Sequence, residues 1–342
     1  MTTSFPLLNL PPSAISHVLK SMNINEFITL SFLSKRAKHS VESMNLKIQF
    51  FSVSISDSVH ITTSIGDNHM RWNFSIDNLT EEQPHAPLPL PDKVDLELFE
   101  YGPYRKIWSM RGLSVKEWIN HFTNIFHLPT VCSITFEENA NTFDIEEIRD
   151  TFKSVDTLSF GNSDGTDVES IIKHFPTREL YFGQGASNTL KHPQKVLIQN
   201  FDQLCLTYKH AGIALTLDDL LMTNSKRVSL IGLEWTGKQV NRFIKHWMRG
   251  SNPRMEDIFI GFMPFFTVNQ LDILKGIKYM ELPKTQLRWF KKEGRRTQQV
   301  EGGIDIYRRD GTRATIKIRQ NEPLTSFHLF VWHPHCIGDP EY

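Results

Sequence analysis

A short pattern that recurs six times between residues 133 and 260 constrains the fold of this chain most strongly. Each copy places two apolar residues around one spacer residue, as in Ile134-Thr135-Phe136 and Leu180-Tyr181-Phe182. The first apolar residues of successive copies lie at 134, 158, 180, 204, 228 and 258, which are 24, 22, 24, 24 and 30 residues apart. Alternating short runs favour strands, and one strand in every roughly 20–30 residues is typical of a solenoid.

The segments between these strands favour helices. Val240, Phe243, Ile244 and Trp247 keep the spacing of one helix face, and Gly250 follows as a stop signal. Only the third spacer is irregular, because Pro193 interrupts it. Strands joined through helices pair in parallel. The repeat therefore predicts an α/β leucine-rich-repeat-like curved solenoid with a parallel sheet on its concave side.

Side chains alternate along a strand, so the residues beside the apolar anchors point away from the core. The bland interpretation of that face is a solvated sheet surface. The sharper interpretation is a substrate-binding surface, because Tyr181 and Phe259 are aromatic anchors among polar neighbours. The residues predicted to face outward are Thr135, Ser159, Tyr181, Cys205, Ser229 and Phe259, flanked by Glu179, Gln203, Arg227 and Asp257.

The N-terminal stretch predicts three short helices. Ile15 and Leu19 belong to the apolar stripe of the first, which begins beside Pro11-Pro12 because proline is tolerated in a first helical turn. The second helix is apolar on two faces, one of which carries Ile28 and Phe32, and Ser34 is an N-cap residue for the third. Three such helices close only a small core. The remaining apolar side chains must therefore pack on the rest of this chain or on another protein.

This stretch resembles an F-box. The matching residues are Leu10-Pro11-Pro12, Ile15, Val18, Leu19, Phe27, Leu30, Leu33 and Ser34-Lys35-Arg36, whereas the aromatic-rich end of the third helix is absent. The resemblance implies helices that dock on the Skp adaptor, and through it on a cullin, in an SCF ubiquitin ligase. The residues expected to bind the Skp adaptor are Leu8, Leu10, Pro11, Pro12, Ile15, Leu19, Ile28 and Phe32.

Residues 215–262 are similar to the F-box-associated (type 2) domain of nematode F-box proteins. Asn224-Ser225, Lys245-His246-Trp247 and the run from Gly250 to Arg254, Gly-Ser-Asn-Pro-Arg, carry this resemblance. It implies a domain that recruits a protein substrate. The last run itself indicates a helix stop and a turn, because glycine ends helices and proline cannot continue them.

The remaining segments complete an α+β chain. Residues 46–76 predict a β meander, Thr80–Lys93 a proline-rich linker and residues 113–126 a helix. Asp310-Gly311 predicts a C-terminal hairpin, and Ser326–Trp332 a further strand, that close the last sheet edge. We expect four parts: an F-box-like region (1–48), an entry region (49–130), the solenoid (131–280) and a hairpin cap with its tail (281–342).

Charge and composition exclude several function classes. Lys and Arg number 38, as do Asp and Glu, which argues against nucleic acid or an acidic membrane as the main partner. Three scattered cysteines form no disulfide framework or zinc pattern. We find no signal peptide and no apolar run long enough to span a membrane. The expected setting is the cytoplasm or the nucleus.

No complete catalytic or cofactor motif is present. His333, His335 and Cys336 lack standard zinc spacing, the Gly183–Ser187 run lacks a full phosphate-loop pattern, and Phe160–Asp167 lacks the ligands of a calcium loop. We therefore expect no enzyme activity, no cofactor and no metal. The two alternatives are a binding solenoid unrelated to ubiquitin, with the N-terminal helices as a cap, and an α/β enzyme with a site at the strand ends.

Overall fold

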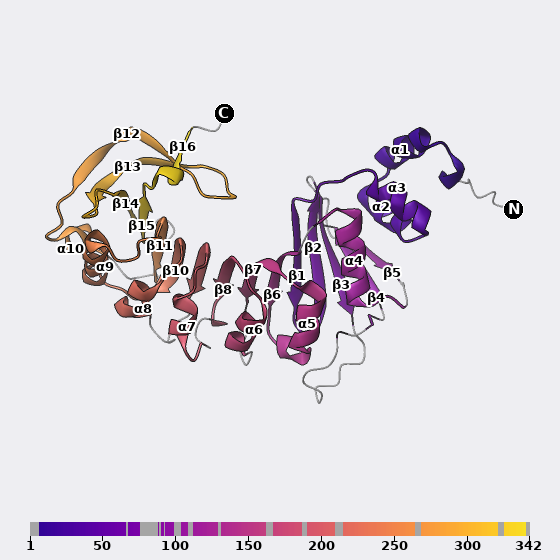
Figure 1. The fold of residues 1–342 in the computed structure, drawn as a ribbon, viewed down its shortest axis with the longest axis horizontal. Coiled ribbons are helices and arrows are strands. Elements are labelled where there is room, and N and C mark those ends of the chain that lie inside the picture. The colour runs from indigo at the N-terminus through magenta and orange to yellow at the C-terminus, as the bar shows by residue number, and fades with distance from the viewer. Residues whose placement is uncertain are drawn as a thin grey trace. The chain divides into compact units, whose positions relative to one another are not determined.

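The computed structural model describes residues 7–65, 68–75, 88, 90–91, 93–98, 104–108, 112–128, 131–161, 167–186, 190–208, 215–263, 268–320 and 325–339. The chain separates into two compact units, Met1–Asp156 and Thr157–Tyr342, called here the N-terminal and the C-terminal unit (Figure 1). Each unit is described by itself. No helix within the described ranges is both long and apolar enough to cross a membrane.

The N-terminal unit begins with the three predicted helices. A short 3-10 turn, η1 (Leu7–Asn9), precedes α1 (Pro12–Ser21), α2 (Ile24–Ser31) and α3 (Lys35–Glu42). Asn23 and Glu26 form a capping box that starts α2, and the Ser34 hydroxyl accepts the Ala37 N–H at the start of α3. The predicted three-helix region is therefore confirmed.

A β sheet follows these helices. Strands β1 (Phe50–Ile55), β2 (Val59–Ile65), β3 (Asn68–Ser75), β4 (Lys93–Leu98) and β5 (Tyr104–Trp108) pair antiparallel in chain order. Strand β6 (Val131–Phe136) pairs parallel with β1 on the other side. The predicted meander is confirmed, whereas the predicted linker at Thr80–Lys93 lies mostly outside the described residues.

Helix α4 (Val115–Ile125) supplies much of the core of this unit. The Phe122 ring lies 4.8 Å from the Trp72 ring and 6.3 Å from the Phe51 ring, so α4 covers the face of β1 and β3. A capping box between Ser114 and Glu117 starts the helix. The unit also contains η2 (Ala140–Thr142) and α5 (Ile145–Phe152).

The C-terminal unit contains the repeated strands in parallel register. Neighbouring strands pair in chain order: β7 (Val155–Phe160), β8 (Glu179–Phe182), β9 (Gln203–Thr207), β10 (Arg227–Leu233) and β11 (Asp257–Phe262). Helices α6 (Val168–His174), α7 (Pro193–Leu197), α8 (Leu217–Met222) and α9 (Gly237–Arg249) separate these strands along the chain. The predicted anchors Leu158, Leu180, Leu204, Val228 and Ile258 are all buried. Parallel strands alternating with helices are thus confirmed.

The C-terminal strands extend this sheet. After α10 (Gln270–Leu274) come β12 (Met280–Phe290), β13 (Gln298–Tyr307), β14 (Arg313–Arg319), β15 (Ser326–Val331), η4 (Pro334–Cys336) and β16 (Ile337–Gly338). The predicted hairpin exists as β13 and β14, and Gly311 adopts φ +87° in its turn. However, β15 rather than the hairpin pairs with β11. The hairpin is joined one strand further out because β14 pairs with β15.

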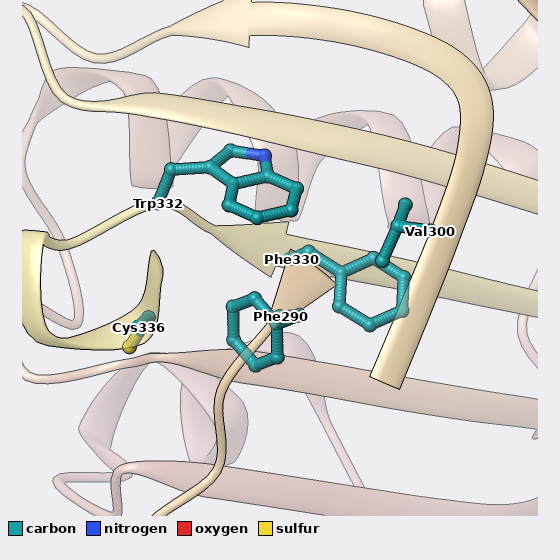
Figure 2. Close-up of a cluster of buried hydrophobic side chains, with 5 residues drawn as sticks. All are labelled: Phe290, Val300, Phe330, Trp332 and Cys336. Carbon is teal, nitrogen blue, oxygen red and sulfur yellow. The ribbon is translucent and has the colours of Figure 1, made fainter. Parts of the chain in front are cut away.

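A second core holds the long β12–β13 ribbon in place. Phe290 and Val300 from that ribbon meet Phe330 and Trp332 from β15 and its end, together with Cys336 (Figure 2). Gly303 in β13 adopts φ +116°, and a Cβ there would lie 2.7 Å from Thr315 Cγ2, so this crossing needs glycine. Figure 1 shows the ribbon on the opposite side of the C-terminal unit from α7 and α8.

The Gly250–Arg254 run is architectural, as its sequence indicates. Gly250 ends α9 with φ +115°. Asn252 adopts φ +50°, and its buried Nδ2 donates to the carbonyl oxygens of Leu220 at 3.0 Å and Thr223 at 2.8 Å. This single amide ties the turn after α9 to the end of α8.

We predict that Asn252→Ala lowers the free energy of unfolding by about 2–4 kcal/mol, because two buried carbonyls each lose a donor. Asn252→Gly should lose the same hydrogen bonds but recover about 1 kcal/mol of left-handed backbone strain. Urea unfolding followed by circular dichroism measures both. Asn120→Ala, at an exposed position of α4, is the control and should change the midpoint little. An Asn252→Ala midpoint equal to that of the control would refute this role.

Candidate functional site

The first candidate surface is formed by α1, α2 and the turns beside them. Among the residues predicted to bind the Skp adaptor, Leu8 and Leu10 are half-buried, and Pro11 and Pro12 are exposed. Ile15, Leu19 and Ile28 are buried inside the chain, so the prediction that they are presented to a partner is wrong for this conformation. Their side chains form the small core that α1–α3 need.

Phe32 is used by the chain itself. Its ring stacks on His121 of α4 at 3.8 Å and lies 4.5 Å from the Trp118 ring. Ser31 Oγ lies 2.7 Å from His121 Nε2, and His127 Nε2 lies 2.9 Å from the Glu42 carbonyl oxygen. The prediction that Phe32 faces a partner is therefore wrong. Phe32 packs on aromatic residues of α4, which lie about 90 residues later in the sequence. We call these contacts the α4 seat.

The α4 seat leaves one large apolar side chain of α1–α3 in solvent. Leu33, directly after α2, is 70% exposed. It follows Phe32 in the chain. The apolar side chains at the end of α2 are therefore of two kinds: Phe32 packs on α4, and Leu33 is exposed to solvent. Leu33, Leu8, Leu10, Pro11 and Pro12 form what we call the open apolar set.

The α4 seat makes stability depend on pH. Burial, aided by Lys38, lowers the pKa of His121 to about 4. The unfolded chain binds a proton on this ring near pH 6.5 while the folded chain does not, so stability present above that pH is lost as the pH falls toward 4. We predict that the urea midpoint, read from tryptophan fluorescence, falls between about pH 7 and about pH 5. His121→Gln should flatten that dependence, whereas the exposed His69→Gln should not; equal slopes in the two variants would contradict this prediction.

The second candidate surface is the sheet face predicted to bind a substrate. Register aligns Glu179, Gln203, Arg227 and Asp257 across β8–β11, and we call this line the first row. A parallel line, the second row, contains Ser159, Tyr181, Cys205, Ser229 and Phe259. The prediction brings these residues together correctly. Thr135 lies on β6 of the N-terminal unit, where it pairs with Ser54.

The first row is a buried charge network rather than an open surface. Arg227 is only 2% exposed. Its Nε donates to Gln203 Oε1 at 3.2 Å, and its terminal nitrogens lie 3.4 Å from Glu179 and 3.8 Å from Glu256. Because a buried guanidinium needs compensating charge and acceptors, these neighbours serve the fold.

A loop of the chain itself covers this row. Residues 291–297, between β12 and β13, form what we call the strap. Arg295 contacts Glu179 Oε2 at 2.9 Å and the Tyr181 hydroxyl at 2.6 Å. Lys292 Nζ lies 2.6 Å from Asp257 Oδ2. Glu179, Gln203, Arg227 and Asp257 are therefore not open to a substrate, and Tyr181 is not a free anchor, which corrects the prediction for those five residues.

The strap also sets the protonation of the groups beneath it. Burial raises the pKa of the Asp257 carboxyl, but His328 and Lys292 outweigh that effect, so the pKa is lowered overall and the carboxylate stays charged. Burial raises the pKa of Tyr181, although the hydrogen bond from Arg295 opposes it. Cys205, in the second row, has a pKa raised by burial and stays a thiol. These directions fit a closed ionic contact rather than a reactive centre.

We predict that Arg295→Gln loosens the strap. Loss of an ion pair worth about 1 kcal/mol raises the open population roughly fivefold. Trypsin cleavage after Lys291 and Lys292, followed by mass spectrometry, should accelerate by that factor. Arg296→Gln removes the neighbouring positive charge, which is exposed, and is the matched control. Equal cleavage rates in the two variants would show that Arg295 does not hold the loop.

The second row stays open at its far end. Phe259 pairs with His328 of β15, which pairs with Lys317 of β14, so the row continues beyond the parallel strands. Phe259, His328 and Lys317 line a cavity of about 690 Å³. Phe259 is thus a member of the predicted substrate-binding set that lines a cavity.

The C-terminal tail forms a different cluster from the one that sequence spacing suggested. Ligand-type atoms of Glu256, His335 and Cys336 lie within 4.8 Å of one another, whereas His333 Nε2 lies 3.1 Å from the Met255 carbonyl oxygen. His335 Nε2 lies 3.1 Å from Glu256 Oε1. Burial raises the pKa of Cys336 to about 12, so its sulfur is a neutral thiol near pH 7.

Comparison with known proteins gives this architecture its class. Residues 7–49 match the F-box domain, and residues 192–260 match the F-box associated family. The α1–α3 region is therefore an F-box domain, and the strand–helix units from α7 to β11 form an F-box associated domain. The chain is 25% identical over 319 residues to the F-box associated domain-containing protein sdz-33 of Caenorhabditis elegans. The match covers 92% of this chain and 94% of that protein. No solved structure matches.

Proposed function

We propose that this protein is a non-catalytic substrate-recognition adaptor of a cullin-type SCF ubiquitin ligase. The F-box helices bind the Skp adaptor, and the C-terminal unit binds a protein substrate. The match of residues 7–49 to the F-box domain carries this proposal. The protein would act by proximity, because holding a substrate beside the ligase raises its effective concentration there. Such an assembly belongs in the cytoplasm or the nucleus.

The open apolar set is the surface that we assign to the Skp adaptor. Leu33 is 70% exposed, and Leu8, Leu10, Pro11 and Pro12 flank the start of α1. Ile15, Leu19, Ile28 and Phe32 contribute indirectly, because they hold the helices together and on the α4 seat. The seat would fix the direction in which the rest of the N-terminal unit extends from a bound adaptor.

We further propose that the repeated units form a leucine-rich-repeat-like solenoid. Buried anchors recur at 158, 180, 204, 228 and 258, and each unit meets its neighbours through parallel strands. A unit of this kind buries its apolar face only by stacking, so substrate contacts fall on a continuous sheet face.

The α4 seat favours the second candidate function, a protein-binding solenoid unrelated to ubiquitination. Phe32 and Ser31 contact α4, so the helices also act as a structural cap. The two functions differ in what the open apolar set does: an adaptor buries it against a partner, whereas a cap leaves it in water.

We predict that the full-length protein binds the purified Skp adaptor with a dissociation constant of about 1 µM or tighter. The double variant Leu10→Asp/Leu33→Asp should weaken binding more than tenfold, because each buried leucine contributes roughly 1.5–3 kcal/mol. Isothermal titration calorimetry measures both. Leu271→Asp makes the same chemical change at a residue that is 76% exposed in the C-terminal unit, and it should bind normally.

Circular dichroism establishes that each variant is folded before titration. Failure of the intact protein to bind the Skp adaptor would end the adaptor proposal and leave the cap. Tight binding by the folded double variant would move the docking surface away from the open apolar set.

A further inference from the structure

The cavity at the end of the second row is lined by both apolar and charged residues. It measures about 690 Å³, within the roughly 300–1,000 Å³ typical of ligand pockets. Phe259, Val300 and Phe330 contribute apolar side chains to the lining, and the strands that carry them are β11, β13 and β15. We call this hollow the ribbon pocket.

The charged side chains that line the ribbon pocket, called its rim here, are mostly positive. Lys284, Lys317 and Arg319 line it, and Glu301 is the acidic residue among the lining side chains. Three cations against one carboxylate leave a net charge of +2. Lys317 donates to the Glu301 backbone carbonyl rather than to its carboxylate. Within the part of the chain that the structure describes, no ion pair joins these three cations to an acidic side chain.

The other cations of this face differ in that respect. Arg227, Lys292 and Arg295 are each paired with a carboxylate of the first row or with Glu256. The electrostatic contact among the rim cations is unfavourable: burial lowers the pKa of Lys317 most, Arg319 and Lys284 add to that effect, and Glu301 opposes it. An anionic group placed between them would relieve this repulsion.

His328 adds a largely buried polar group to the lining of the pocket. Among the described residues its Nε2 has no hydrogen-bond partner, and Asp257 Oδ2 lies 3.7 Å away. Burial lowers the pKa of His328 in the first place, and Lys292 and Arg319 act in the same direction, whereas Asp257 opposes them. The ring is therefore neutral near pH 7, and a polar ligand atom can pair with it.

We propose that the ribbon pocket binds an acidic peptide segment of a protein partner, with a carboxylate side chain between Lys317 and Arg319 and a neighbouring apolar side chain against Phe259. The excess positive charge of the lining favours the carboxylate of the peptide, and the apolar lining residues favour an apolar side chain next to it. This inference rests on the proposed function, because it gives the chemical class of the substrate that the C-terminal unit recruits.

The probe is a fluorescein-labelled pool of ten-residue peptides with a central Glu-Glu-Leu or Glu-Glu-Phe core and random flanks. The matched pool carries Gln in place of both Glu residues. Fluorescence anisotropy with the full-length chain, in the absence of the Skp adaptor, should show at least tenfold tighter binding of the Glu pool. The affinity should fall as salt is raised, because the rim is exposed.

The double variant Lys317→Gln/Arg319→Gln should weaken binding of the Glu pool at least tenfold. Lys278→Gln/Arg309→Gln removes the same two charges at exposed positions outside the pocket and should leave binding unchanged. Thermal unfolding checks that both variants fold alike. Equal binding of the Glu and Gln pools, or equal loss in both double variants, would overturn the proposal.

A third pool with phosphoserine at the two Glu positions distinguishes a site for acidic peptides from a site for phosphopeptides. Binding of that pool alone, with the Glu pool silent, would overturn the acidic-peptide assignment in favour of a phosphopeptide. Since no Skp adaptor is present, this assay and the calorimetric one fail independently: a bound peptide without Skp binding leaves a peptide-binding protein outside the ligase.

Discussion

The buried guanidinium of Arg227 is the constraint on which the face of the C-terminal unit depends. A cation removed from water costs several kcal/mol unless acceptors and opposite charges surround it. Gln203 meets that need from the neighbouring strand β9, Glu179 from β8 one strand further away, and Glu256 from the residue before β11. Glu179 in turn holds Arg295, so the strap closes over the row. The charge pairing therefore depends both on the register between the strands and on the path of the β12–β13 ribbon, which carries the strap.

Local and periodic features could be predicted from the sequence. The 3.6-residue and two-residue periods, the capping residues and the Asp310-Gly311 turn each act over a few neighbours, so α1–α3, the meander, the parallel strands and the hairpin all follow from them. The two rows of outward residues also follow, because alternation along β8–β11 places them without any knowledge of the rest. Alternation does not indicate which other segment of the chain covers a sheet face.

The failures share one physical cause, which is contact between segments far apart in the chain. Phe32 was assigned to a partner because its helix is apolar on two sides, but His121 and Trp118 of α4 satisfy that second side. The first row was assigned to a substrate because alternation along the strands points its residues away from the core, but Arg295 and Lys292 arrive from a loop beyond β12. Oppositely charged runs in the sequence do not reveal which charges will meet, so these pairings needed coordinates.

Both candidate surfaces follow from the same distinction between groups that the fold satisfies and groups that it leaves over. On the F-box side, the core and the α4 seat use Ile15, Leu19, Ile28 and Phe32, and Leu33 remains in water. On the sheet side, carboxylates pair Arg227, Lys292 and Arg295, whereas no acidic side chain among the described residues pairs with the rim cations Lys317 and Arg319. Exposed apolar side chains favour a partner with an apolar surface, and cations without a neighbouring carboxylate favour an anionic partner. Two surfaces of different chemistry favour two different partners, because a partner that suits one surface would bind the other poorly.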